Sequence, residues 1–182
     1  RKLPVIVFFL SLGIFLHGKQ FAGPYDMVFK SFSMCNDTGK NAFVFSTKFS
    51  KLNRTHLTYT SNLSAPLGLT NNMKTVCDVS VFGNGGWKKN FMKITLARTC
   101  SDMVKTFPGL GESFLEAANF NFTGCPVPPG TYYVKNWIFH IEMAMPVFPY
   151  GLYQFEVTIT ENYEVLTCYK LILEFVPKSN RH

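Results

Sequence analysis

The five cysteines have the widest chemical range of any side chains in this sequence, since a thiol can bind zinc, attack a substrate or form a disulfide. They are Cys35, Cys77, Cys100, Cys125 and Cys168. Their spacing contains no Cys-x-x-Cys pair and no cysteine–histidine pairing suited to zinc, so we expect no metal site. In a secreted chain an odd number of cysteines indicates a disulfide framework with one thiol left over.

Histidine, the commonest general base of hydrolases, is scarce and falls in no catalytic motif. The four histidines are His17, His56, His140 and His182. Residues 111–115 miss a Gly-x-Ser-x-Gly elbow by its second glycine, and there is no His-Glu-x-x-His motif or dinucleotide-binding glycine loop. Acidic residues are few and isolated, which argues against paired catalytic carboxylates. We therefore predict that the protein is not an enzyme and needs no cofactor.

Asparagine sequons provide a different kind of modification site. Four N-x-S/T sequons begin at Asn36, Asn53, Asn62 and Asn121. A sequon accepts a glycan only in a secreted protein and at an exposed position. We expect surface positions for these asparagines and at least one glycan.

The start of the chain predicts secretion. Two positively charged residues precede an apolar run over residues 5–16, and polar residues follow. This is the layout of a signal peptide, and the run is shorter than the roughly 20 residues that a membrane-spanning helix needs. We expect a signal over residues 1–18, with the small residues Gly18 and Ala22 as alternative cut sites, and a secreted, extracellular protein.

The net charge of +7 is spread along the chain. No run of basic residues is longer than the pair Lys88-Lys89. Nucleic-acid binding usually needs a concentrated basic stripe, so we expect no nucleic-acid partner. A generally basic surface explains the charge, and the alternative is a weak preference for anionic lipid headgroups at a membrane surface.

Apolar and polar residues alternate with a period of two through most of the chain, which predicts strands. We expect strands over residues 25–32, 41–49, 54–60, 73–82, 93–96, 131–145, 152–160 and 163–175. Gly83–Gly86 is a strong turn signal after the fourth of these, and only Glu161 and Asn162 separate the last two, as in a two-residue hairpin.

One region breaks the alternation. Ser101 can cap a short helix whose apolar residues have helical spacing, and Pro108-Gly109 interrupts it. We interpret residues 101–118 as a helical insertion. The predicted fold is an all-β sandwich or cup of two sheets, with about seven to eight antiparallel strands, over a single domain at residues 23–176 and a tail at 177–182.

Aromatic and apolar side chains are abundant, with 19 phenylalanines in the chain. In the two clearest strands the apolar faces consist of Tyr133, Trp137, Phe139, Ile141 and Met143, and of Phe155, Val157 and Ile159. A well-packed sandwich needs such residues, and so does a pair of splayed sheets around an apolar cavity. Periodicity does not separate these alternatives, because both use the same residues.

Several segments of the second half occur in an order that resembles one large insect family. They are Trp87–Phe91, residues 93–100, residues 121–126, residues 131–137 and Pro146–Val157. The family consists of small secreted proteins related to the ganglioside activator and to ML (lipid-recognition) domain proteins, and it includes gustatory proteins implicated in pheromone sensing. The resemblance covers residues 25–175. It implies a β-cup that holds a lipid or another hydrophobic small molecule.

The resemblance also implies two disulfides. One is Cys100–Cys125, which encloses the helical insertion, and the other is Cys35–Cys168, which joins the first and last strands. Cys77 is then the odd thiol. It is either buried and inert, the alternative we favour, or exposed and used for dimerisation.

The leading hypothesis is therefore a secreted binding protein for a hydrophobic ligand, with a role in chemosensory perception. The expected ligand-binding residues are the two apolar faces named above together with Met103, Phe107 and Phe114 from the helical insertion. One rival is a protein-interaction module with a solid core that docks on a receptor or channel. Another is a lipid-presenting cofactor of a hydrolase, which exposed apolar residues such as Trp87 and Phe91 would favour.

Overall fold

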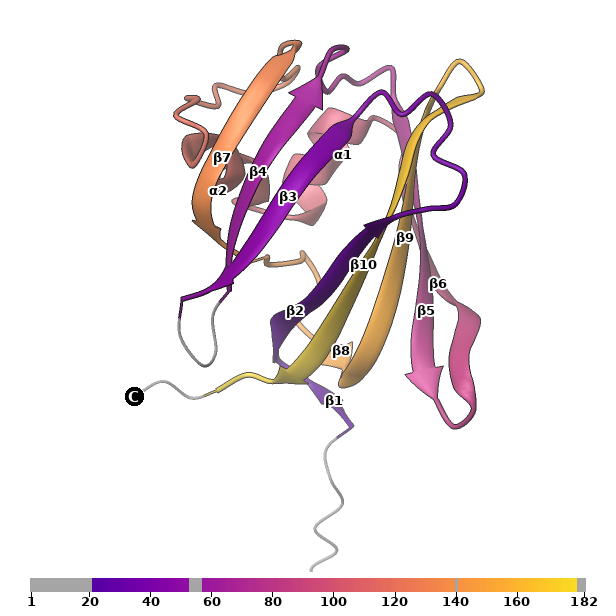
Figure 1. The fold of residues 1–182 in the computed structure, drawn as a ribbon. Coiled ribbons are helices and arrows are strands. Elements are labelled where there is room, and N and C mark those ends of the chain that lie inside the picture. The colour runs from indigo at the N-terminus through magenta and orange to yellow at the C-terminus, as the bar shows by residue number, and fades with distance from the viewer. Residues whose placement is uncertain (1–20, 53–56, 140, 180–182) are drawn as a thin grey trace, which may run out of the picture.

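The computed structural model describes residues 21–52, 57–139 and 141–179, which form antiparallel sheets and two short helices (Figure 1). The predicted signal segment, the Asn53 sequon and all four histidines lie outside the described residues. Neither helix in the part of the chain described is long and apolar enough to cross a membrane.

Three sheets can be distinguished. The largest has the order β2-β10-β9-β5-β6, a second has the order β3-β4-β7, and β1 pairs with β8. The strands are β1 (Ala22–Gly23), β2 (Tyr25–Met34), β3 (Val44–Lys51), β4 (Leu57–Ala65), β5 (Lys74–Gly83), β6 (Gly86–Leu96), β7 (Gly130–Ile138), β8 (Phe148–Pro149), β9 (Gly151–Glu161) and β10 (Glu164–Pro177). The helices are α1 (Thr99–Thr106) and α2 (Leu110–Glu116). The predicted all-β sandwich or cup with a helical insertion is confirmed.

The five-stranded and three-stranded sheets face each other (Figure 1). On one side the helices bridge the edges of the sheets, since α1 contacts β6, α2 contacts β7 and the helices contact each other. On the other side aromatic rings of β2 and β3 meet, with centroids 4.5 Å apart for Phe29 and Phe49 and 5.4 Å apart for Phe32 and Phe45. The sheets therefore enclose an interior between two closed sides.

Alternation fixes which face of the five-stranded sheet is polar. Cross-strand ion pairs join Glu156 to Lys170 at 3.1 Å and Asp78 to Lys93 at 3.1 Å. The apolar neighbours of these residues along the strands point to the opposite face, because successive side chains of a strand alternate. Charge lies on the outside of this sheet and apolar surface faces the interior.

The hairpin between β9 and β10 is displaced by one residue from the prediction. Glu161 pairs with Glu164, so the two turn residues are Asn162 and Tyr163. Both have positive φ, 50° and 66°, as a type I′ turn requires. Asparagine tolerates this conformation well, and Tyr163 is fully exposed, so its ring meets no neighbour there.

The assignment of Tyr133 to the inner face is wrong. Its side chain is 58% exposed, whereas Tyr132 and Val134 are buried. The prediction carried one alternation through residues 131–145, but Asn136 adopts a left-handed conformation with φ of 52°, and the pairing of β4 with β7 shifts between Tyr59 and Ser61. This extra residue reverses the parity, so Trp137 points inward and Tyr133 points outward.

Other strand limits also differ from the prediction. Strand β7 ends at Ile138, so residues 141–145 are not part of it, and β6 begins at Gly86 rather than at Lys93. Strand β6 is an edge strand, and its exposed Lys88-Lys89-Asn90 segment hides the alternation. Charged residues are typical of such edges.

Candidate ligand-binding cavity

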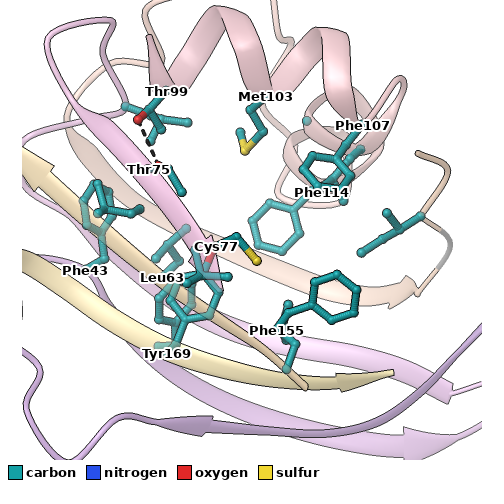
Figure 2. Close-up of a pocket in the computed structure, with 18 of the residues that line it drawn as sticks. Phe43, Leu63, Thr75, Cys77, Thr99, Met103, Phe107, Phe114, Phe155 and Tyr169 are labelled. Carbon is teal, nitrogen blue, oxygen red and sulfur yellow. Dashed lines mark hydrogen bonds between the residues drawn. The ribbon is translucent and has the colours of Figure 1, made fainter. Parts of the chain in front are cut away.

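A cavity of about 300 Å³ lies between the facing sheets and the helices (Figure 2). Its wall is formed by the inner faces of both sheets, by α1 and α2, and by the segment that follows β7. Ligand pockets begin at about this size. An apolar cavity of roughly half this volume is known to stay dry and to bind benzene.

Ten of the eleven predicted ligand-binding residues line this cavity, and Tyr133 does not. The ten are Trp137, Phe139, Ile141, Met143, Phe155, Val157, Ile159, Met103, Phe107 and Phe114. In Figure 2 the side chains of Met103, Phe107 and Phe114 extend from the helices toward Phe155 on the opposite sheet. The helical insertion therefore supplies one wall of the cavity.

Sequence reasoning missed the contribution of the N-terminal strands. Five phenylalanines of β2, β3 and the segment between them line the cavity, namely Phe29, Phe32, Phe43, Phe45 and Phe49. Part of this contribution is visible in the sequence, because Phe45 and Phe49 alternate with polar residues along β3 in the same way as the apolar residues of β9. The same alternation, applied to the predicted strand 41–49, places Phe43, Phe45 and Phe49 on one face. Phe29 and Phe32 have opposite parity along β2, and both line the cavity because the pairing with β10 shifts register between them.

Two threonines form a polar spot in the wall. The Thr99 hydroxyl donates to the Met73 carbonyl at 2.8 Å, and the hydroxyls of Thr75 and Thr99 are 2.9 Å apart (Figure 2). The Thr99 hydroxyl has a single hydrogen, which it donates to the Met73 carbonyl. The Thr75 hydroxyl must therefore donate to the Thr99 oxygen. Both hydroxyl hydrogens are thus committed within the protein.

Tyr169 and Cys77 form a second polar spot. Tyr169 on β10 and Cys77 on β5 both pair with Val157 of the intervening strand β9, and Figure 2 shows both in the wall. Burial raises the pKa of the Cys77 thiol to about 12, and the nearby Asp78 carboxylate adds to this. Burial also raises the pKa of Tyr169, with smaller contributions from Cys77 and Tyr59. Both groups therefore remain neutral at physiological pH.

The cysteines form the two disulfides that the resemblance implied. Cys35 is bonded to Cys168 and Cys100 to Cys125, and the remaining thiol, Cys77, is buried. Cys35 and Cys168 lie near Glu156, and within the described residues this is the one cluster of metal-ligating types. The disulfide removes both thiolates from such a role, so the cluster has no metal-binding character.

Three of the predicted glycosylation sites can be located. Asn36, Asn62 and Asn121 are exposed, and none of them lines the cavity. A glycan at any of these positions would project into solvent rather than into the interior.

One comparison with known proteins gives a match. Residues 73–155 match the model of a family described as a protein of unknown function, DUF1091. The matched range runs from the start of β5 into β9 and includes both helices and the Cys100–Cys125 disulfide. No curated protein matches the chain.

Proposed function

We propose that this protein is a secreted carrier that holds a lipid or another hydrophobic small molecule between its two sheets. The observation that carries the proposal is the apolar cavity of about 300 Å³, to which both sheets and both helices contribute. Two disulfides support a secreted protein, because such bonds persist in oxidising compartments. The family resemblance adds a chemosensory role, such as presentation of a pheromone.

Binding in this cavity would draw mainly on the burial of apolar surface. Each Å² of apolar surface removed from water contributes about 25 cal/mol. Because the wall offers few polar groups to orient a ligand, we expect affinity to follow the size and shape of the apolar part, and we expect several related ligands to bind.

The cavity counts against an interaction module with a solid core. The lipid-presenting cofactor is the stronger rival, because four exposed apolar residues lie on or near the hairpin of β5 and β6. Phe82, Trp87 and Phe91 are 51%, 36% and 41% exposed, and Phe82 and Trp87 are in ring contact. Val147, next to Phe148 in the segment that Phe91 contacts, is 56% exposed. These side chains could enter a lipid interface, and the adjacent Lys88 and Lys89 would suit anionic headgroups.

The test begins with the protein secreted from insect cells. The purified protein is extracted with organic solvent, and mass spectrometry of the extract is expected to detect a lipid or hydrocarbon at close to one molecule per chain. The protein from which the ligand has been removed, called the extracted protein below, is then titrated with the fluorescent probe N-phenyl-1-naphthylamine. The probe should bind in the emptied cavity.

A pair of variants at Met103 locates the site. Met103 lines the cavity from α1 and points into it (Figure 2). Met103→Trp should fill much of the space and weaken probe binding at least about tenfold, which is about 1.4 kcal/mol. Met103→Leu nearly conserves the volume and should bind as the parent does. An empty extract with no probe binding by folded, disulfide-intact protein would refute the proposal.

A further inference from the structure

The cavity wall is uncharged in the part of the chain that the structure describes. Its lining consists of apolar, aromatic, threonine, cysteine and glycine residues, without an aspartate, glutamate, lysine or arginine. Four charged residues of the five-stranded sheet form two ion pairs on its outer face, Asp78 with Lys93 and Glu156 with Lys170. A carboxylate ligand in the cavity would therefore meet no cation among the described lining residues, and burial without one carries a large desolvation cost.

Most hydroxyl groups in the wall already have partners. Thr75 and Thr99 use both of their hydrogens within the protein, as described above. The Tyr132 hydroxyl donates to the Pro128 carbonyl. The Tyr59 hydroxyl accepts a hydrogen bond from Thr47, with 3.4 Å between the oxygens.

Tyr169 is different. Its hydroxyl has no hydrogen-bond partner among the described residues, although the ring packs against both Phe32 and Phe45, at centroid distances of 5.7 and 5.6 Å. Burial raises the pKa of Tyr169, so the hydroxyl keeps its hydrogen and can donate it. Leaving a hydroxyl without a partner beside an apolar cavity is unfavourable. An acceptor on the ligand would supply the missing partner.

We propose that the ligand is an uncharged apolar chain that carries an oxygen acceptor, such as a long-chain alcohol, aldehyde or ester, and that the Tyr169 hydroxyl donates a hydrogen bond to this oxygen. The proposal rests on the proposed function and adds a chemical class to it. Of the polar groups near Tyr169, the Cys77 thiol is a weaker donor, and the Tyr59 hydroxyl already has a partner in Thr47.

The experiment measures displacement of N-phenyl-1-naphthylamine from the extracted protein at pH 7.4 by three compounds with the same twelve-carbon chain. They are 1-dodecanol, dodecane and laurate. We expect 1-dodecanol to displace the probe at concentrations at least about tenfold lower than laurate, because only laurate brings an unpaired charge into the cavity.

Tyr169→Phe tests the role of the hydroxyl. Removing this one oxygen conserves the ring and its packing, and it should weaken 1-dodecanol about 5- to 10-fold, a typical value for one neutral hydrogen bond. Binding of dodecane should not change. Tyr132→Phe is the matched control, because Tyr132 also lines the cavity but already donates to Pro128, and it should not alter the preference among the three compounds.

Two results would overturn this inference while leaving the carrier function intact. One is displacement by laurate at the same concentration as by 1-dodecanol. The other is a Tyr169→Phe variant that binds 1-dodecanol as the parent does, or that loses affinity equally for the alcohol and the alkane. Failure of the probe and of all three compounds to bind would instead refute the carrier function together with its ligand class.

Discussion

The inner face of the five-stranded sheet supports two regions that differ in how completely they are filled. At one end, rings of Tyr25, Phe148, Tyr153 and Phe175 pack with centroid distances between 4.4 and 6.0 Å. We call these four residues the aromatic cluster. Farther along the same strands, the inner face borders the cavity.

The two regions are filled differently because different segments of the chain cover them. The short pairing of β1 with β8 aligns Gly23 with Phe148 and brings the Phe148 ring directly onto Phe175, 4.4 Å away. The Tyr153 hydroxyl donates to the Pro149 carbonyl at 3.0 Å, which ties this segment to β9. Over the cavity, helices α1 and α2 bridge the edges of the two sheets instead. Identical strand patterns thus give a solid core where a peptide segment lies on the sheet, and a hollow where helices span the gap.

The largest expected effect on stability comes from removing one aromatic ring from the aromatic cluster, compared with removing one from the cavity wall. Phe175 is 1% exposed and contacts four other rings. Phe175→Ala should lower the free energy of unfolding by about 4 kcal/mol, as is typical for a buried phenylalanine. Phe107→Ala in the cavity wall should cost only about 1 kcal/mol, because one side of that ring already lacks packing partners.

Guanidinium unfolding of the extracted protein, with disulfides intact, measures both variants. Equal losses of stability at Phe175 and Phe107 would mean that the two regions are packed alike in solution and that the cavity collapses without ligand. A much smaller loss at Phe107 would support the distinction.

The sequence alone was sufficient to predict which face of β9 points inward and where most of the helical insertion lies. In β9 the strict alternation of Phe155, Val157 and Ile159 with polar residues leaves one consistent orientation, and all three line the cavity. The helical spacing between Met103 and Phe107 likewise indicated a helix with an apolar side. Local periodicity carries this information because burial repeats with the geometry of each element.

The orientation of Tyr133 and the cavity itself could not be predicted in this way. The bulge at Asn136 depends on pairing with β4, where the Thr60 hydroxyl accepts the Asn136 N–H at 3.1 Å. The space between the sheets depends on contacts between residues far apart in the chain. Neither the bulge nor the space between the sheets can be predicted from the alternation of residues within a single strand.

Removing the disulfide beside the cavity should have the next largest effect. Cys100–Cys125 closes an interval of 25 residues that contains α2 and all of α1 except Thr99. Its loss in the double variant Cys100→Ala/Cys125→Ala should cost about 3 kcal/mol through the greater entropy of the unfolded chain. If the two regions are independent, amide hydrogen exchange should rise most in α1, α2 and β7 and least around Phe175. Uniform loss of protection would contradict the comparison.

The smallest effect concerns the one free thiol among the described cysteines, which lies in the cavity wall and not in the aromatic cluster. Burial raises the pKa of Cys77 from 9.0 to about 12. Between these values the unfolded chain has released the thiol proton while the folded chain retains it, so stability falls as the pH rises. From pH 8 to pH 10 this single group should lower the free energy of unfolding by about 1.4 kcal/mol. Cys77→Val should show a pH dependence shallower by that amount, as measured by unfolding at both pH values. Identical slopes would show that the thiol ionises normally in the folded protein, and hence that water reaches this part of the cavity.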